Sequence, residues 1–212
     1  MEKLQKTMDV GLPPGTLVPP DEPPLLAGVK ITVFDFNEQG FREKIINSID
    51  ECIPFKDQPT ITWINVDGIQ RPEILERLGH GFGLHPLVLE DITHTDQRSK
   101  VDDYDSFMFL IFKMLELKPG SLDIHSEQIS LVVGSNFVIS FQESEGDIFD
   151  NIRDRIRNNK GRVRKMKADY LAYCLLDTVI DYYFVILEKI GLEIDRIEEE
   201  LMGNPSSRTL HG

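Results

Sequence analysis

The sequence is poor in cysteine, with only Cys52 and Cys174 among 212 residues. The two lie far apart, each in an apolar context typical of a helix, and no paired spacing accompanies them. This scarcity argues against both a disulfide framework and a cysteine-based zinc site. We therefore expect two reduced core residues of a cytosolic protein.

Long apolar runs are also missing. A bilayer-spanning helix needs about 20 predominantly apolar residues in succession, and the chain contains no such uninterrupted run. The first residues, MEKLQKTMDVG, have no apolar stretch either, so we expect no signal peptide.

Basic residues are outnumbered, with 23 Lys and Arg against 36 Asp and Glu and a net charge of -13. A nucleic-acid partner would require a basic face, so we expect none. The acidic excess is compatible with cation binding, although many soluble proteins carry such an excess for solubility alone. The composition, 41% hydrophobic and 28% charged, is that of a folded protein with a substantial core.

Hydrophobic periodicity divides the chain into three parts. Residues 1–28 are a tail that holds six of the twelve prolines, and proline forbids a regular helix there. Residues 29–165 alternate between strand and helix patterns. The predicted elements are a strand at 29–36, helices at 41–53, 71–83 and 86–93, and strands at 60–68, 107–115, 127–133 and 136–141. The apolar segment at 107–115 is typical of a central strand, and Gly134 and Ser135 predict a hairpin. The sequence therefore predicts an α/β fold, a mixed sheet sandwiched between helices (α/β/α).

The third part, residues 166–212, is predicted to form a long helical arm and the start of a second helix. Residues 153–167 carry eight basic residues and one acid, whereas residues 168–202 carry nine acids and two bases. Along the predicted long helix, apolar residues recur at alternating spacings of three and four, a heptad seam typical of a helix packed against a partner. The seam consists of Tyr173, Leu176, Ile180, Tyr183, Leu187, Ile190, Ile194, Ile197 and Leu201.

The segment HPLVLEDITHTDQRSKVDDYDSF, residues 85–107, concentrates acids next to an apolar helical turn. Glu90 and Asp91 are adjacent there, and buried charge of this kind requires a positive partner. A divalent cation is one candidate; solvation, or pairing with Arg98 or Lys100, is the alternative. Neighbouring helical residues point about 100° apart, so Glu90 and Asp91 do not readily chelate one ion as a pair.

Two other chemistries remain open from the residues. Glu90 and His94 lie four apart on one helical face, as a zinc ligand pair would, but no third ligand is evident nearby. A metal-dependent hydrolase using Glu90 and Asp91 would need both acids in a concave pocket. No recognisable nucleophile arrangement accompanies them, and we expect no enzyme.

The chain as a whole resembles the cytoplasmic N-terminal domain of CorA-type magnesium transporters. The resemblance covers nearly everything from about Gly11 onward. It rests on the order of the segments GLPPGTLV, TWINVDGI, HPLVLEDI with DQRSKVDDYD, SEQISLVV, FVISFQE, RDRIRNNKGRVRKMKADYL and LLDTVIDYYFVILEKI. The family's Gly-Met-Asn sequence and two membrane helices are missing from these residues. The resemblance therefore implies a soluble fragment, truncated in the helical arm before the transmembrane helices and unable to transport by itself.

The resemblance also implies a function and a site. The domain would sense intracellular Mg²⁺, at the cytoplasmic face of the cell membrane, through acids at the subunit interfaces of a homopentamer, and would gate the pore. Asp91 and Glu90 match acids that the family places at this interface, and Asp177 matches a helical acid near it. For Asp177 the alternative is a salt bridge to the basic segment at 153–167. The regulatory ion would be Mg²⁺, with Co²⁺ or other divalent cations as further candidates. The related zinc-transporter branch is the alternative assignment.

Overall fold

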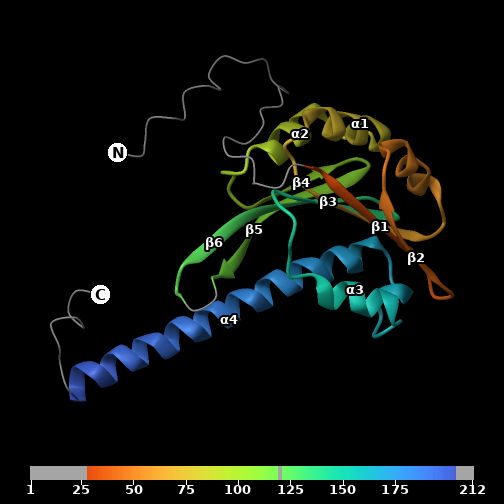
Figure 1. Cartoon of the computed structure of the whole chain (residues 1–212). Coiled ribbons are helices and arrows are strands. Elements are labelled where there is room, and N and C mark those ends of the chain that lie inside the picture. Colours follow the sequence, from red (N-terminus) through yellow and green to blue (C-terminus); the bar gives the residue numbers. More distant parts are fainter. Residues whose placement is uncertain (1–27, 119–120, 204–212) are drawn as a thin grey trace, which may run out of the picture.

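The computed structural model describes residues 28–118 and 121–203 and consists of one mixed sheet between two helical layers (Figure 1). The expected proline-rich tail, apart from Gly28, and the expected start of a second helix lie outside these residues. The strands are β1 (Lys30–Phe36), β2 (Phe41–Ile46), β3 (Ile61–Asp67), β4 (Lys100–Tyr104), β5 (Phe107–Leu117), β6 (Ile124–Val133) and β7 (Phe137–Gln142). Their order is β2-β1-β3-β7-β6-β5-β4, and every neighbouring pair is antiparallel except β3 with β7. The predicted α/β class is confirmed.

Helices cover both faces of the sheet (Figure 1). One face carries α1 (Pro72–Phe82), α2 (Pro86–Thr93) and the short 3-10 helices η1 (Ile49–Glu51) and η2 (Ile53–Asp57). The other carries α3 (Asp150–Arg157), the 3-10 helix η3 (Val163–Lys165) and the first half of α4 (Ala168–Gly203). Each face of the sheet has its own hydrophobic core, and successive strand residues pack into opposite cores. Ile64 faces α1, whereas Trp63 packs with Phe149 beside α3.

The helix predicted at 41–53 is wrong. This segment forms β2, followed by η1 and η2. Its apolar residues are spaced as on a helix, but five of the six β2 side chains are exposed, so that spacing marks no buried face. The turn before this segment makes it a strand instead. Asn37 Oδ1 accepts hydrogen bonds from the backbone N–H groups of Gln39 (2.9 Å) and Gly40 (3.0 Å), and the chain turns back to pair with β1.

Two further strands differ from expectation. The sequence did not predict β4, whose acid-rich residues alternate between half-buried and exposed at the edge of the sheet. The apolar strand β5, expected at the centre, is second from that edge, although its side chains enter both cores. The hairpin predicted at Gly134 is confirmed, with the Gly134 N–H donating to the Phe137 carbonyl at 2.9 Å.

The long helix α4 has two different halves. Between Ala168 and Ile186 it buries one face on the sheet, whereas residues after Ile186 project beyond it (Figure 1). The predicted heptad seam lies largely outside this buried face: Leu187 is 61% and Ile194 51% exposed. By length and composition, α4 is the one helix of the described chain that could cross a membrane. A core helix of a globular protein satisfies the same criterion, so this single helix is weak evidence for a span.

Candidate functional site

Helix α2 presents the acids Glu90 and Asp91. Its first turn is capped by His85, whose Nδ1 accepts a hydrogen bond from the Leu87 N–H at 3.2 Å, and Pro86 occupies the favoured first position. The α2 side chains that face the core pack toward α1. A Cβ at Gly79 of α1 would lie 2.7 Å from Leu89 Cδ1, so glycine permits this close approach. Burial of Leu89 thereby fixes the adjacent acids at the domain surface.

The Asp91 carboxylate is held by one cation and one amide. Lys100 Nζ lies 2.7 Å from Oδ2, and Gln97 Nε2 donates to Oδ1 at 3.0 Å. Lys100 also pairs with Asp102 at 2.9 Å. Burial alone would lower the pKa of Lys100, but its bonds to these two carboxylates raise it above the ordinary value. Of the sequence-based alternatives for Asp91, pairing with Lys100 is therefore present in the structure.

Glu90 lies beside Asp91 on the half-buried surface of α2. Its carbonyl accepts hydrogen bonds from the His94 N–H at 3.0 Å and the Thr93 hydroxyl at 2.9 Å, which ends the helix. Across residues 28–118 and 121–203, no three His, Cys, Asp or Glu side chains are grouped so that they could hold a metal ion. The described chain therefore does not complete a zinc site around Glu90 and His94.

Asp177 lies on the exposed surface of α4. A hydrogen bond with this carboxylate raises the pKa of the Tyr173 hydroxyl. Because α2 and α4 pack against opposite faces of the sheet, the structure does not bring Asp177 together with Glu90 and Asp91. The basic segment forms other contacts: Arg157 binds Glu43, and Arg164 donates to the carbonyls of Asn37 and Glu38.

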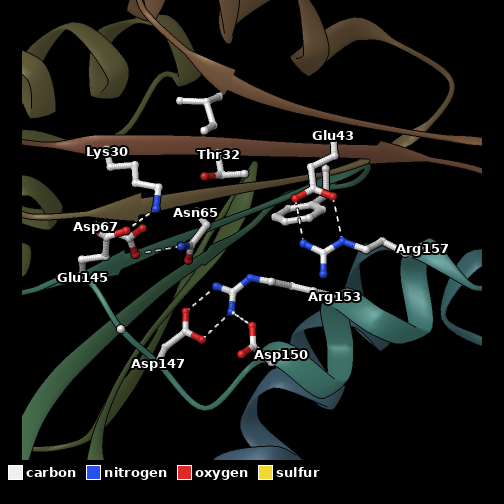
Figure 2. Close-up of a pocket in the computed structure, with 13 residues that line it drawn as sticks. Lys30, Thr32, Glu43, Asn65, Asp67, Glu145, Asp147, Asp150, Arg153 and Arg157 are labelled. Carbon is white, nitrogen blue, oxygen red and sulfur yellow. Dashed lines mark hydrogen bonds and ion pairs between the residues drawn. The ribbon is translucent and has the colours of Figure 1, made fainter.

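Sequence reasoning missed a second polar site, a cavity of about 330 Å³ between strands β1 to β3 and helix α3 (Figure 2). Charged side chains line it in pairs. Arg157 binds Glu43 through two hydrogen bonds of 2.8 Å, Lys30 pairs with Glu145, and Arg153 binds both Asp147 and Asp150. These cations are matched by neighbouring acids, so the cluster joins α3 to the strands.

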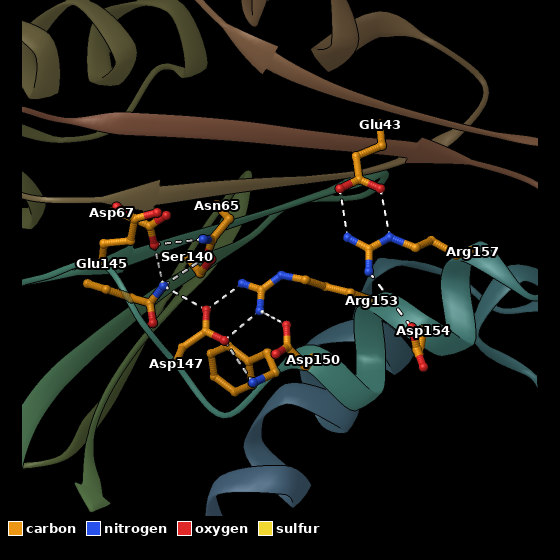
Figure 3. Close-up of polar contacts among 12 residues, drawn as sticks. Glu43, Asn65, Asp67, Ser140, Glu145, Asp147, Asp150, Arg153, Asp154 and Arg157 are labelled. Atoms are coloured by element: carbon orange, nitrogen blue, oxygen red, sulfur yellow. Dashed lines mark hydrogen bonds and ion pairs between the residues drawn. The ribbon is translucent and has the colours of Figure 1, made fainter.

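A buried hydrogen-bond network continues from this cavity into the sheet (Figure 3). Gln142 Nε2 lies 2.8 Å from Asp67 Oδ1, 3.1 Å from Asn65 Oδ1 and 3.1 Å from Asp147 Oδ2. Burial, followed by the nearby Asp147 charge, raises the pKa of Asp67 to about 6. The signal in the sequence was a polar residue, Asp67, at the end of an apolar strand. Asn65, two residues earlier, donates to Asp67 Oδ1 at 2.8 Å, but Gln142 comes 75 positions later, so spacing alone could not identify the network.

Comparison with known proteins gives one family. The family model described as CorA-like Mg²⁺ transporter protein matches residues 59–211. The cobalt/magnesium transport protein CorA of Thermotoga maritima is 43% identical over 210 residues, which cover 99% of this chain. The chain spans 59% of the length of that relative.

Two solved structures share the fold. The full-length CmaX protein has a TM-score of 0.69 and 18% identity, with 88% of this chain and 58% of that chain covered. The soluble domain of CorA from Methanocaldococcus jannaschii has a TM-score of 0.61 and 16% identity, with 85% and 68% covered. At these identities the likeness concerns the fold alone.

Proposed function

The chain belongs to the family of CorA-like Mg²⁺ transporter proteins, and from this premise we propose that it is the cytoplasmic regulatory domain of a divalent-cation channel. It senses intracellular Mg²⁺ at the cytoplasmic face of the cell membrane, and the pore carries Mg²⁺ and Co²⁺. Residues 29–165 form the sensor domain and residues 166–212 the helical arm, preceded by the tail at 1–28. The family is one of transporters, so the hydrolase hypothesis is rejected.

The main support for this proposal is that the candidate ligand acids lie on opposite sides of the domain. Glu90 and Asp91 lie on the α2 side and Asp177 on the α4 side. In a ring of identical subunits each contact joins two different faces of neighbouring copies. The α2 side of one subunit then meets the α4 side of the next, and the acids that one copy keeps apart come together at the interface. We infer a homopentamer in which each interface contains such a site.

The donor set suits Mg²⁺. This ion prefers carboxylate oxygens and keeps several of its waters, so one or two carboxylates from each subunit suffice. The Asp91 side chain is 20% exposed, and its cationic partner Lys100 is 33% exposed. Both side chains are half-buried, and a divalent ion in place of this ammonium would bring twice its positive charge to the carboxylate.

Gating follows from the charge balance at the interface. At high Mg²⁺ the ions neutralise the acids and hold neighbouring subunits together in the closed state. When Mg²⁺ falls, repulsion among Asp91, Glu90 and Asp177 loosens the ring and the pore opens. A ligand that binds only the closed state shifts the equilibrium by its difference in affinity for the two states.

Calorimetry on the full-length protein tests the site. We expect Asp91→Ala to weaken Mg²⁺ binding about tenfold or more, because a charged ligand is lost. Asp103→Ala is the matched control: it removes one exposed acid of β4 and should leave the affinity unchanged. Equal Mg²⁺ affinity in wild type and Asp91→Ala would reject the assignment.

Ion competition on the full-length protein distinguishes the magnesium branch of the family from the related zinc-transporter branch. Zn²⁺ that displaces Mg²⁺ at physiological levels would assign the chain to the zinc transporters.

A further inference from the structure

Strand β5 extends beyond its edge partner. β4 begins at Lys100, which pairs with Ile111, whereas β5 continues to Leu117 with β6 alone on its other side. Lys113 lies just past the end of this pairing, where the register would place Arg98 opposite it. Lys113 remains paired with Gln128 of β6, but its side chain and its backbone carbonyl also bind segments outside the sheet.

The side chain of Lys113 binds the segment that follows α2. Its Nζ donates a hydrogen bond to the carbonyl of Thr95. Thr95 belongs to the connection at 94–99, which also contains Gln97, the amide partner of Asp91. The connection that leads from the Asp91 site to β4 is therefore tied to β5 through Lys113.

The backbone of Lys113 binds α4. Its carbonyl accepts a hydrogen bond from the Tyr183 hydroxyl, and burial raises the pKa of that hydroxyl, which keeps it protonated as a donor. Tyr183 lies one turn before Ile186, the last buried residue of α4. The contact thus holds α4 at the point where it leaves the sheet.

We propose that Lys113 and Tyr183 are positioning residues that transmit ion occupancy at Asp91 to α4. This inference rests on the proposed function, because it takes the Asp91 site as the input. An ion that draws Asp91 away from Lys100 and Gln97 moves the connection at 94–99. Lys113 passes that movement to its own backbone, and Tyr183 passes it to α4. The proposal requires that ion occupancy change the balance between the bonded and the broken state of these hydrogen bonds.

The test measures Mg²⁺ binding and α4 dynamics separately on the full-length protein. Calorimetry gives the Mg²⁺ affinity, and hydrogen exchange with and without saturating Mg²⁺ gives the protection of residues 187–203. Tyr183→Phe removes only the hydroxyl. We expect it to leave the Mg²⁺ affinity within about twofold and to reduce the Mg²⁺-dependent protection about fivefold, the effect of one hydrogen bond. Tyr182→Phe is the matched control and should preserve the protection.

Lys113 provides a second, independent variant. Lys113→Met removes the donor to Thr95 and should lower the Mg²⁺-dependent protection as Tyr183→Phe does, whereas Lys113→Arg keeps a donor and should restore it. A purely structural role would instead raise exchange equally with and without Mg²⁺. That result, or unchanged protection in Tyr183→Phe, overturns the inference while Mg²⁺ binding stands. Absence of Mg²⁺ binding in the wild type would reject the proposed function and the inference together.

Discussion

Two aspartates show how environment separates acids of the same type. Asp91 is half-buried, with the Lys100 ammonium 2.7 Å from its carboxylate. Asp67 is 6% exposed and accepts hydrogen bonds from Asn65 and Gln142, with Asp147 nearby. The charge of Asp91 is matched by an adjacent cation, whereas Asp67 carries a desolvation cost whenever it is ionised.

The pKa of Asp67 predicts a pH-dependent effect of Asp67→Asn. The folded-state pKa, about 6, is above the ordinary value of 3.8, so the native state binds more protons between these values and stability falls as pH rises through this window. Asn keeps the shape and an acceptor oxygen without the charge. We expect the variant to gain about 2 to 3 kcal/mol of unfolding free energy at pH 8 relative to pH 4.

Urea unfolding at the two pH values measures this gain. Glu145→Gln is the control, since this acid lines the same cavity but is exposed, and its pairing with Lys30 should change stability by less than about 1 kcal/mol. A gain from Asp67→Asn that is equal at both pH values would show that Asp67 is not ionised at a cost in the native state.

At the scale of elements, the sequence predicts what a periodic apolar pattern determines. The helices at 72–82 and 86–93 and the hairpin at Gly134 follow from such patterns and from proline and glycine positions. β2 and β4 could not be found this way, because both lie at sheet edges: five of the six β2 side chains are exposed, and the half-buried positions of β4 are the polar Lys100 and Asp102 and the aromatic Tyr104, not an apolar series. Antiparallel pairing with the strand next in sequence, β1 for β2 and β5 for β4, determines them. The same limit applies to Asp91, whose partner Gln128 comes from β6 and binds its carbonyl at 3.1 Å.

Helix α4 gives an element-scale prediction, because its apolar residues fall into a buried and an exposed set. Leu175 is fully buried, whereas Leu187, on the predicted heptad seam, is 61% exposed. Leu175→Ala should lower the unfolding free energy by about 2 to 5 kcal/mol through the cavity that it creates. Leu187→Ala should change it by about 0.5 kcal/mol or less.

Denaturant unfolding of this 212-residue chain at low concentration checks the pair, with each leucine serving as the other's control. Comparable losses would mean that the seam is already packed in the isolated chain. Sedimentation velocity on the same samples would then identify self-association as the source of that packing.

At the scale of the whole molecule, the sheet separates the candidate ligands and so makes the proposed site a property of the assembly. A single copy keeps Asp91 and Asp177 on opposite sides. Two variants that each lack one acid can therefore complement one another, because one supplies Asp91 and the other Asp177. Complementation within one subunit is impossible for either variant, so the outcome separates an interface site from a site inside the domain.

We expect mixed rings of full-length Asp91→Ala and Asp177→Ala subunits to regain Mg²⁺ binding. With equal, random mixing, about one interface in four pairs an intact α2 side with an intact α4 side. Calorimetry should then detect high-affinity Mg²⁺ sites at about a quarter of the wild-type number, while each variant alone shows only the weakened affinity. Mixing Asp91→Ala with a variant that carries both Asp91→Ala and Asp177→Ala is the control and should restore none, because neither partner supplies Asp91. If the Asp91→Ala and Asp177→Ala mixture binds only as the average of its parents, the two acids do not share a site across the interface.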